Sequence, residues 1–212
     1  MSETPQVDPD ELQAQLDQIK DAMGIDERYA GATRQWLLFG VLVTVASGIS
    51  QYVYRQHLPG YWFTVVWTVV LFGGGVVGLR LLFDGDRRPS LGTEAGKPSL
   101  WFVFGVIYLA DVPIQVVADR FIPSLGYEAQ IVFALSVILV LVGIAYLLIG
   151  NALRAYYIRS RDRYAFYAGG LLLIGLGVSI PYVDVLWTWG YAVFGGLYLV
   201  YALATYAVLT RT

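Results

Sequence analysis

Few side chains in this sequence are of a type that supports catalysis or metal binding. His57 is the only histidine, and cysteine is absent. One chain therefore cannot assemble a bis-histidine haem site, a Cys/His zinc site, an iron–sulfur cluster or a cysteine nucleophile. Both lysines, Lys20 and Lys97, lie outside the long apolar segments, which excludes a Schiff-base lysine within them. We expect no metal ion and no cofactor.

One carboxylate stands inside an otherwise uncharged apolar segment. Asp111 is followed by Pro113 and Gln115, and a proline removes one helical hydrogen bond, so a helix can bend there and gather polar groups. A charge among apolar groups is costly unless it is paired, hydrated or protonated, which makes Asp111 a candidate polar site. Possible partners are the polar stripe of the first apolar segment, or two arginines near the outer surface. The stripe consists of Thr44, Ser47 and Gln51, and the arginines are Arg55 and Arg120. The alternative is that the helix ends early and leaves Asp111 in the outer headgroup region of a membrane.

The segments that carry these residues are long and nearly free of charge. Hydrophobic residues make up 57% of the 212 residues and charged residues 14%, whereas soluble domains are roughly 45–50% apolar. A hydrocarbon core about 30 Å thick requires about 20 helical residues, and continuous apolar runs favour helices over the alternating strands of a barrel. The sequence predicts an all-α, polytopic transmembrane helix bundle with six spans, over 35–54, 60–82, 98–118, 129–153, 164–183 and 186–210.

Basic residues are distributed unevenly between the two sides of these spans. Twelve of the fourteen fall on one side, and only Arg55 and Arg120 fall on the other. Because short loops rich in Lys and Arg stay in the cytoplasm, we expect a multi-pass protein of the cell membrane with both termini cytoplasmic. The twelve Arg against two Lys, with an acidic tail, resemble the composition of membrane proteins from salt-adapted archaea. This likeness implies no family.

The first 33 residues differ in character from the membrane domain at 34–212. They carry eight acidic and two basic side chains. Asp8 and Pro9 are typical of a helix start, and four apolar residues then recur at spacings of 4, 3 and 4, which predicts a short amphipathic cytoplasmic helix. Its apolar stripe either packs on the protein's own bundle or docks a partner, and its acidic face opposes binding to anionic lipid. The stripe consists of Leu12, Leu16, Ile19 and Met23.

Small residues at a spacing of four occur in three of the spans. Gly74 and Gly78 lie in the second span, and Ala192 and Gly196 lie in the sixth. Ala165 and Gly169 lie in the fifth span. Such pairs let two helices approach closely, so they indicate packing within the bundle or a homodimer contact.

These patterns favour a non-enzymatic role, because the spans hold no pair of groups suited to general acid and base catalysis. We expect a membrane scaffold or regulatory subunit that recruits a cytoplasmic protein through the N-terminal helix. The alternative is a small transporter or channel that uses Asp111. The expected surroundings are a lipid bilayer, and nothing indicates a nucleic-acid partner.

Overall fold

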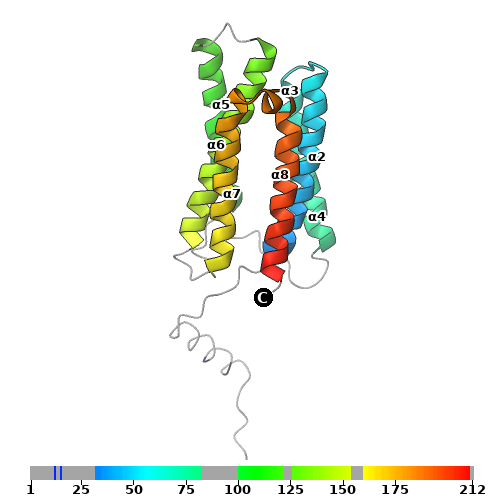
Figure 1. The fold of residues 1–212 in the computed structure, drawn as a ribbon. Helices are drawn as coiled ribbons and strands as arrows, with labels where there is room; N and C mark the ends of the chain where they lie inside the picture. The colour runs from blue at the N-terminus through cyan, green and yellow to red at the C-terminus, as the bar shows by residue number, and fades with distance from the viewer. Residues whose placement is uncertain are drawn as a thin grey trace, which may run out of the picture.

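The computed structural model describes residues 32–82, 100–121, 126–153 and 160–210, together with Leu12 and Gln15. Within this part of the chain the structure is almost entirely helical and has no strand. The helices run alternately up and down in one bundle (Figure 1). The start of α2 (Ala32–Arg55) and the end of α8 (Asp184–Thr210) therefore lie at the same, lower end.

Each predicted span coincides with helical structure, and the ends differ from the expected ones by up to four residues. The second span is built from three consecutive pieces, because a π-helical segment interrupts the α-helix. After α2, the elements in chain order are α3 (Tyr61–Thr68), the π segment η1 (Val69–Gly73), α4 (Gly74–Leu82), α5 (Leu100–Phe121), α6 (Tyr127–Ala152), α7 (Ser160–Ser179), the 3₁₀ turn η3 (Ile180–Tyr182) and α8.

The all-α part of the prediction is confirmed. Several of these helices are also long and apolar enough to cross a membrane. Five segments of the described chain meet both conditions: Trp36–Arg55, Tyr61–Gly78, Tyr127–Ala152, Ser160–Tyr182 and Asp184–Thr210.

Helix α5 has 22 residues, which rise about 33 Å at about 1.5 Å per residue. It runs through Pro113 without interruption and ends at Phe121. The expectation of an early helix end is therefore wrong, because Asp111 lies near the middle of a continuous helix. A residue with non-helical backbone angles lies instead in α8. The depth of Asp111 in a membrane stays a prediction.

The turn after α2 is closed by backbone hydrogen bonds around His57. The His57 N–H donates to the Tyr54 carbonyl at 3.1 Å, and the Leu58 N–H donates to the Val53 carbonyl at 3.1 Å. This is the Schellman pattern, in which the residue after the helix takes a left-handed conformation. His57 occupies that position with φ of 51°, although glycine is the usual residue there.

The helices form two groups that lie side by side in Figure 1, with α2, α3, α4 and α8 in one and α5, α6 and α7 in the other. Close backbone approach holds each group together. A methyl group at Gly40 of α2 would lie 2.6 Å from the Ala202 side chain of α8, and one at Gly143 of α6 would lie 2.7 Å from the Gly170 carbonyl oxygen of α7.

Aromatic side chains fill the lower part of the space between the two groups. The Trp36 ring of α2 lies 5.1 Å from Phe166 of α7, 6.0 Å from Tyr146 of α6 and 5.5 Å from Tyr201 of α8, between ring centroids. The hydroxyl groups of Tyr146 and Tyr198 share a hydrogen bond of 2.5 Å. Edge-to-face and tilted aromatic contacts of this kind add to the gain from apolar burial, so the groups meet in a packed core.

A second set of contacts joins the groups at the upper end. The Tyr127 hydroxyl, at the start of α6, donates to the Leu58 carbonyl oxygen at 2.8 Å. His57 Nε2 lies 3.5 Å from the Glu128 Oε1, and the rings of Tyr54 and Tyr127 stack with centroids 6.5 Å apart. The loop between α2 and α3 is therefore fastened to the first turn of α6.

Candidate functional site

The backbone of α8 leaves helical geometry at one residue near its upper end. Trp189 has φ of −119° and ψ of 17°, so a short first segment meets the long remainder of α8 at a kink. Sharp kinks arise at prolines, at π-bulges, or where a side chain or water enters the hydrogen-bond ladder. No proline lies within α8, so a side chain from a neighbouring helix is the cause to look for.

Gln51 of α2 supplies that side chain. Its Nε2 donates to the Thr188 carbonyl oxygen at 3.0 Å, and its Oε1 accepts from the Ala192 N–H at 3.1 Å. An uninterrupted α-helix pairs these same two backbone groups with each other, four residues apart. The amide of Gln51 therefore takes the place of one helical hydrogen bond. It does so in a buried position, since only 6% of the residue is exposed.

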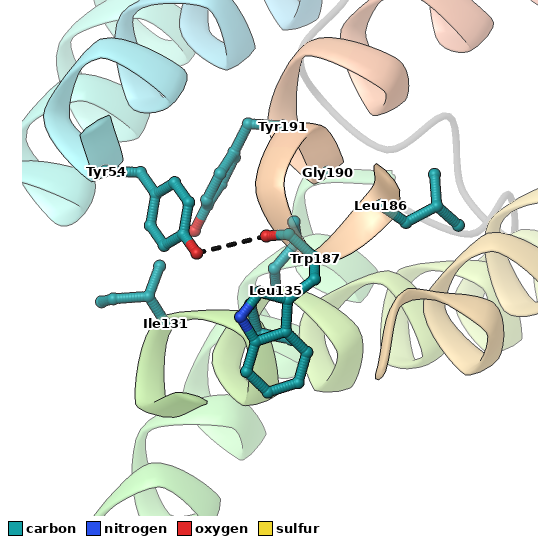
Figure 2. A pocket seen from close by; sticks show the side chains of 8 residues that line it. Tyr54, Ile131, Leu135, Leu186, Trp187, Gly190 and Tyr191 are labelled. Carbon is teal, nitrogen blue, oxygen red and sulfur yellow. Dashed lines mark hydrogen bonds between the residues drawn. The ribbon is translucent and has the colours of Figure 1, made fainter. Parts of the chain in front are cut away.

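A second side chain of α2 contacts the same segment of α8. The Tyr54 hydroxyl donates to the Trp187 carbonyl oxygen at 3.2 Å (Figure 2). This contact lies at a pocket between α2, α6 and the kinked part of α8, and the pocket has about 10 Å³ of space, which is room for about one water molecule. The lining residues are Tyr54, Ile131, Val132, Leu135, Leu186, Trp187, Gly190 and Tyr191.

Gln51 and Tyr54 belong to a buried polar stripe along the face of α2 that packs on α8. Thr44, one turn before Ser47, donates from its hydroxyl to the Gly40 carbonyl of its own helix at 2.7 Å and also lies 3.1 Å from the Gly195 carbonyl of α8. Ser47 and Ser50 are fully buried, and their hydroxyl groups have no hydrogen-bond partner in the described part of the chain. The stripe thus holds both satisfied and unsatisfied polar groups next to the kink.

Asp111 lies on the other side of the bundle, and the structure does not bring it together with Gln51, whose amide is engaged by α8. The carboxylate is half-buried and has an interaction partner. Its partly covered neighbours on α5 are Val103, Ile107 and Ile114, at helical spacing, and this is the face that packs towards α6. Pro113 is exposed on another face, and the side chain of Gln115 lies outside the described residues.

The predicted pairs of small residues in the second and sixth spans have different surroundings. Gly74 and Gly78 face α2, because a methyl group at either position would overlap the side chain of Leu42 or Leu38, respectively. Ala192 and Gly196 are exposed, and nothing in the described chain lies within 4 Å of a methyl group placed at Gly196.

The close contact of α8 with α2 is made one position away from the predicted pair. A methyl group at Gly195 would lie 2.8 Å from the Ser47 side chain. Within the described bundle, Gly195 rather than Gly196 is therefore the packing glycine.

The predicted docking stripe of the N-terminal segment is described at one position. Leu12 is helical and 51% exposed. Leu16, Ile19 and Met23 lie outside the described residues.

Comparison with known proteins gives no relative. No family model matches the sequence, and no curated protein or solved structure matches the chain. Function is therefore argued from the helices and their contacts alone.

Proposed function

We propose that this chain is a six-span protein of the cell membrane, with both termini in the cytoplasm, that acts as a non-enzymatic scaffold or regulatory subunit. It recruits a soluble protein through the amphipathic N-terminal helix. In addition to the five segments named above, we count α5, the third predicted span, as a crossing, because it has the length of a span and lies beside α6 in Figure 1.

The use of polar groups in the bundle supports this proposal. The side chains of Gln51 and Tyr54 bond to the backbone of α8 and hold it against α2, and the Thr44 hydroxyl lies 3.1 Å from the Gly195 carbonyl oxygen of α8. Aromatic side chains fill the lower space between the helix groups, and the pocket beside the kink has room for about one water molecule. Polar side chains that bond across helices serve helix association, so these buried groups have a structural use within the bundle.

The test changes the stripe of the tail and leaves the bundle intact. The variant carries Leu16→Glu and Ile19→Glu, and the matched control carries Gln15→Glu and Gln18→Glu, which add the same charge to the same segment. Each protein is crosslinked in its native membranes and purified, and its partners and oligomer mass are measured. We expect a stoichiometric partner to remain with the control and to be lost from the stripe variant, because charges on the stripe prevent its burial. Identical partners and masses for all forms would contradict the proposal.

A transporter or channel is the second candidate, and the position of Asp111 favours it. The carboxylate lies near the middle of a 22-residue helix, half-buried on the face that packs towards α6. An ionisable group at such a position in a span is typical of an ion or proton pathway.

This alternative is tested with purified protein in liposomes. Asp111→Asn should abolish most of a cation or proton flux and remove its pH dependence, because the amide does not titrate. Asp184→Asn, at an exposed acid in the first turn of α8, is the matched control and should keep the flux. Equal flux through both variants would exclude a role for Asp111 in transport.

A further inference from the structure

The kink in α8 leaves the same hydrogen-bonding groups with two ways of being paired. In the structure, the Gln51 amide bridges the Thr188 carbonyl and the Ala192 N–H. If Gln51 withdraws, these two groups stand four residues apart on one helix and can bond to each other. Both pairings satisfy the backbone in a region where an unpaired N–H or C=O is costly. The two arrangements therefore differ mainly in the hydrogen-bond partner of the Gln51 amide.

Ser47 offers the withdrawn amide a partner. It lies one turn before Gln51 on the same face of α2, and its hydroxyl is fully buried without a hydrogen-bond partner in the described chain. Residues four apart on a helix are neighbours, so the Gln51 amide can reach this hydroxyl when it leaves α8. A buried unsatisfied hydroxyl calls for a structural reason, and a role in a second arrangement supplies one.

We propose that α8 has two conformations, kinked and continuous, and that the hydrogen-bond partner of the Gln51 amide determines which one forms. In the kinked state, the Gln51 amide bonds to the Thr188 carbonyl and the Ala192 N–H and keeps these two groups from pairing with each other. In the continuous state, the Ala192 N–H donates to the Thr188 carbonyl and the Gln51 amide bonds to Ser47. The inference concerns the fold itself and holds whether the protein recruits a partner or transports an ion.

Straightening α8 changes the junction between the two helix groups. Trp187 and Gly190 lie at the kink and line the pocket shared with Tyr54 of α2 and Leu135 of α6 (Figure 2). Just outside this pocket, the Arg55 guanidinium lies 5.3 Å from the centre of the Trp189 ring. Movement of the segment Asp184–Trp189 changes the lining of this pocket and the position of the Trp189 ring relative to Arg55. The pairing of Gln51 therefore links the shape of α8 to the contact between the two helix groups at the upper end.

The experiment measures the length of α8 across the kink. The sequence has no cysteine, so Val185→Cys and Val200→Cys, at positions 63% and 64% exposed, introduce two spin labels for distance measurement by pulsed EPR in nanodiscs. Fifteen residues of straight helix span about 22 Å between Cα atoms, and a kink shortens this distance. The labels are combined with Gln51→Leu, which removes both hydrogen bonds at similar volume, and with Gln51→Met as a second variant.

We expect the Gln51 variants to shift the distance distribution to a longer mean, towards that of the straight helix, because Thr188 and Ala192 must then pair with each other. Gln56→Leu, the same change at an exposed position beyond α2, should leave the distribution unchanged. Ser47→Ala in the otherwise unchanged protein should remove any longer-distance population. A single unchanged distribution in the Gln51 variants would overturn the proposal. Failure of both variants to fold would also overturn it, because a continuous state would then not be available to α8.

Discussion

Two glycines, Gly143 of α6 and Gly170 of α7, allow their helices to approach closely because they carry no side chain. A methyl group at Gly170 would lie 2.7 Å from the Gly143 carbonyl oxygen and 2.8 Å from the Leu147 side chain, and one at Gly143 would lie 2.7 Å from the Gly170 carbonyl oxygen. Backbone atoms cannot yield as a side chain can, so this contact is specific for glycine on both helices. At Gly175, also on α7, a methyl group would have no atom of the described chain within 4 Å.

Gly170 and Gly175, both on α7, should therefore respond differently to alanine. Gly170→Ala should lower stability by about 1–3 kcal/mol, as overpacking of a tight contact does. Gly175→Ala should be neutral or raise stability by about 0.5–1 kcal/mol, because alanine has less conformational freedom to lose in a helix. Thermal unfolding in detergent, followed by circular dichroism, gives both values. Equal effects at the two positions would mean that α6 and α7 do not meet at Gly170.

At the scale of elements, the lengths of the helices follow from the sequence, but the faces they turn to one another do not. Uncharged runs of about 20 residues set the spans because a bilayer sets their length, and the helices found lie within four residues of those runs. A helix that is apolar all round has no amphipathic side to reveal its neighbour. For this reason the sequence points to Ala192 and Gly196 as contact positions, within the bundle or between two copies, whereas inside the described bundle the adjacent Gly195 makes the contact with Ser47.

The candidate site was predictable in its residues and not in its partners. Gln51 stands out in the sequence as an amide within an apolar run, but its partners, Thr188 and Ala192, lie more than 130 residues further along the chain. Pro113 predicts a bend in α5, yet α5 is continuous and α8 is kinked at Trp189. A side chain inserted from another helix leaves no local signal in the helix that it breaks.

The continuous course of α5 leads to a prediction about its proline. Pro113 has no N–H for the carbonyl oxygen of Leu109, four residues earlier, and both residues are exposed on the surface of the bundle. Pro113→Ala should restore that hydrogen bond without leaving a cavity, and should raise stability by up to about 3 kcal/mol. Ala110→Pro, at an exposed position in the same helix, should lower it by a similar amount. A loss of stability in Pro113→Ala, measured by thermal unfolding, would show that the native packing of α5 depends on the proline.

For the molecule as a whole, two helix groups are joined at both ends by side chains of different kinds. Aromatic rings around Trp36 join them at the lower end, and the contacts of Tyr127 and Glu128 with the turn after α2 join them at the upper end. The pairing of α2 with α8 brings the first and last described helices together, so α5, α6 and α7 form a group inserted between them in sequence. The start of α2 and the end of α8 thus share the lower end of the bundle.

Orientation in the membrane follows from the same arrangement and from the distribution of arginine. The lower end holds the starts of α2 and α7 and the ends of α4 and α8 (Figure 1), and the chain segments next to these helix ends carry twelve of the fourteen basic residues. Because basic segments are retained in the cytoplasm, we expect the lower end to face the cytoplasm and the upper end to face outwards.

Single cysteines in this cysteine-free chain test that orientation. Gln56→Cys and Tyr182→Cys lie at exposed positions of the upper end, and Thr210→Cys lies at an exposed position of the lower end. A maleimide that cannot cross membranes should label the first two in intact cells, and should label Thr210→Cys only after the cells are permeabilised. Labelling of Thr210→Cys in intact cells would reverse the orientation. Labelling of Gln56→Cys and Tyr182→Cys only after permeabilisation would do the same, and the arginine distribution would then have a cause other than topology.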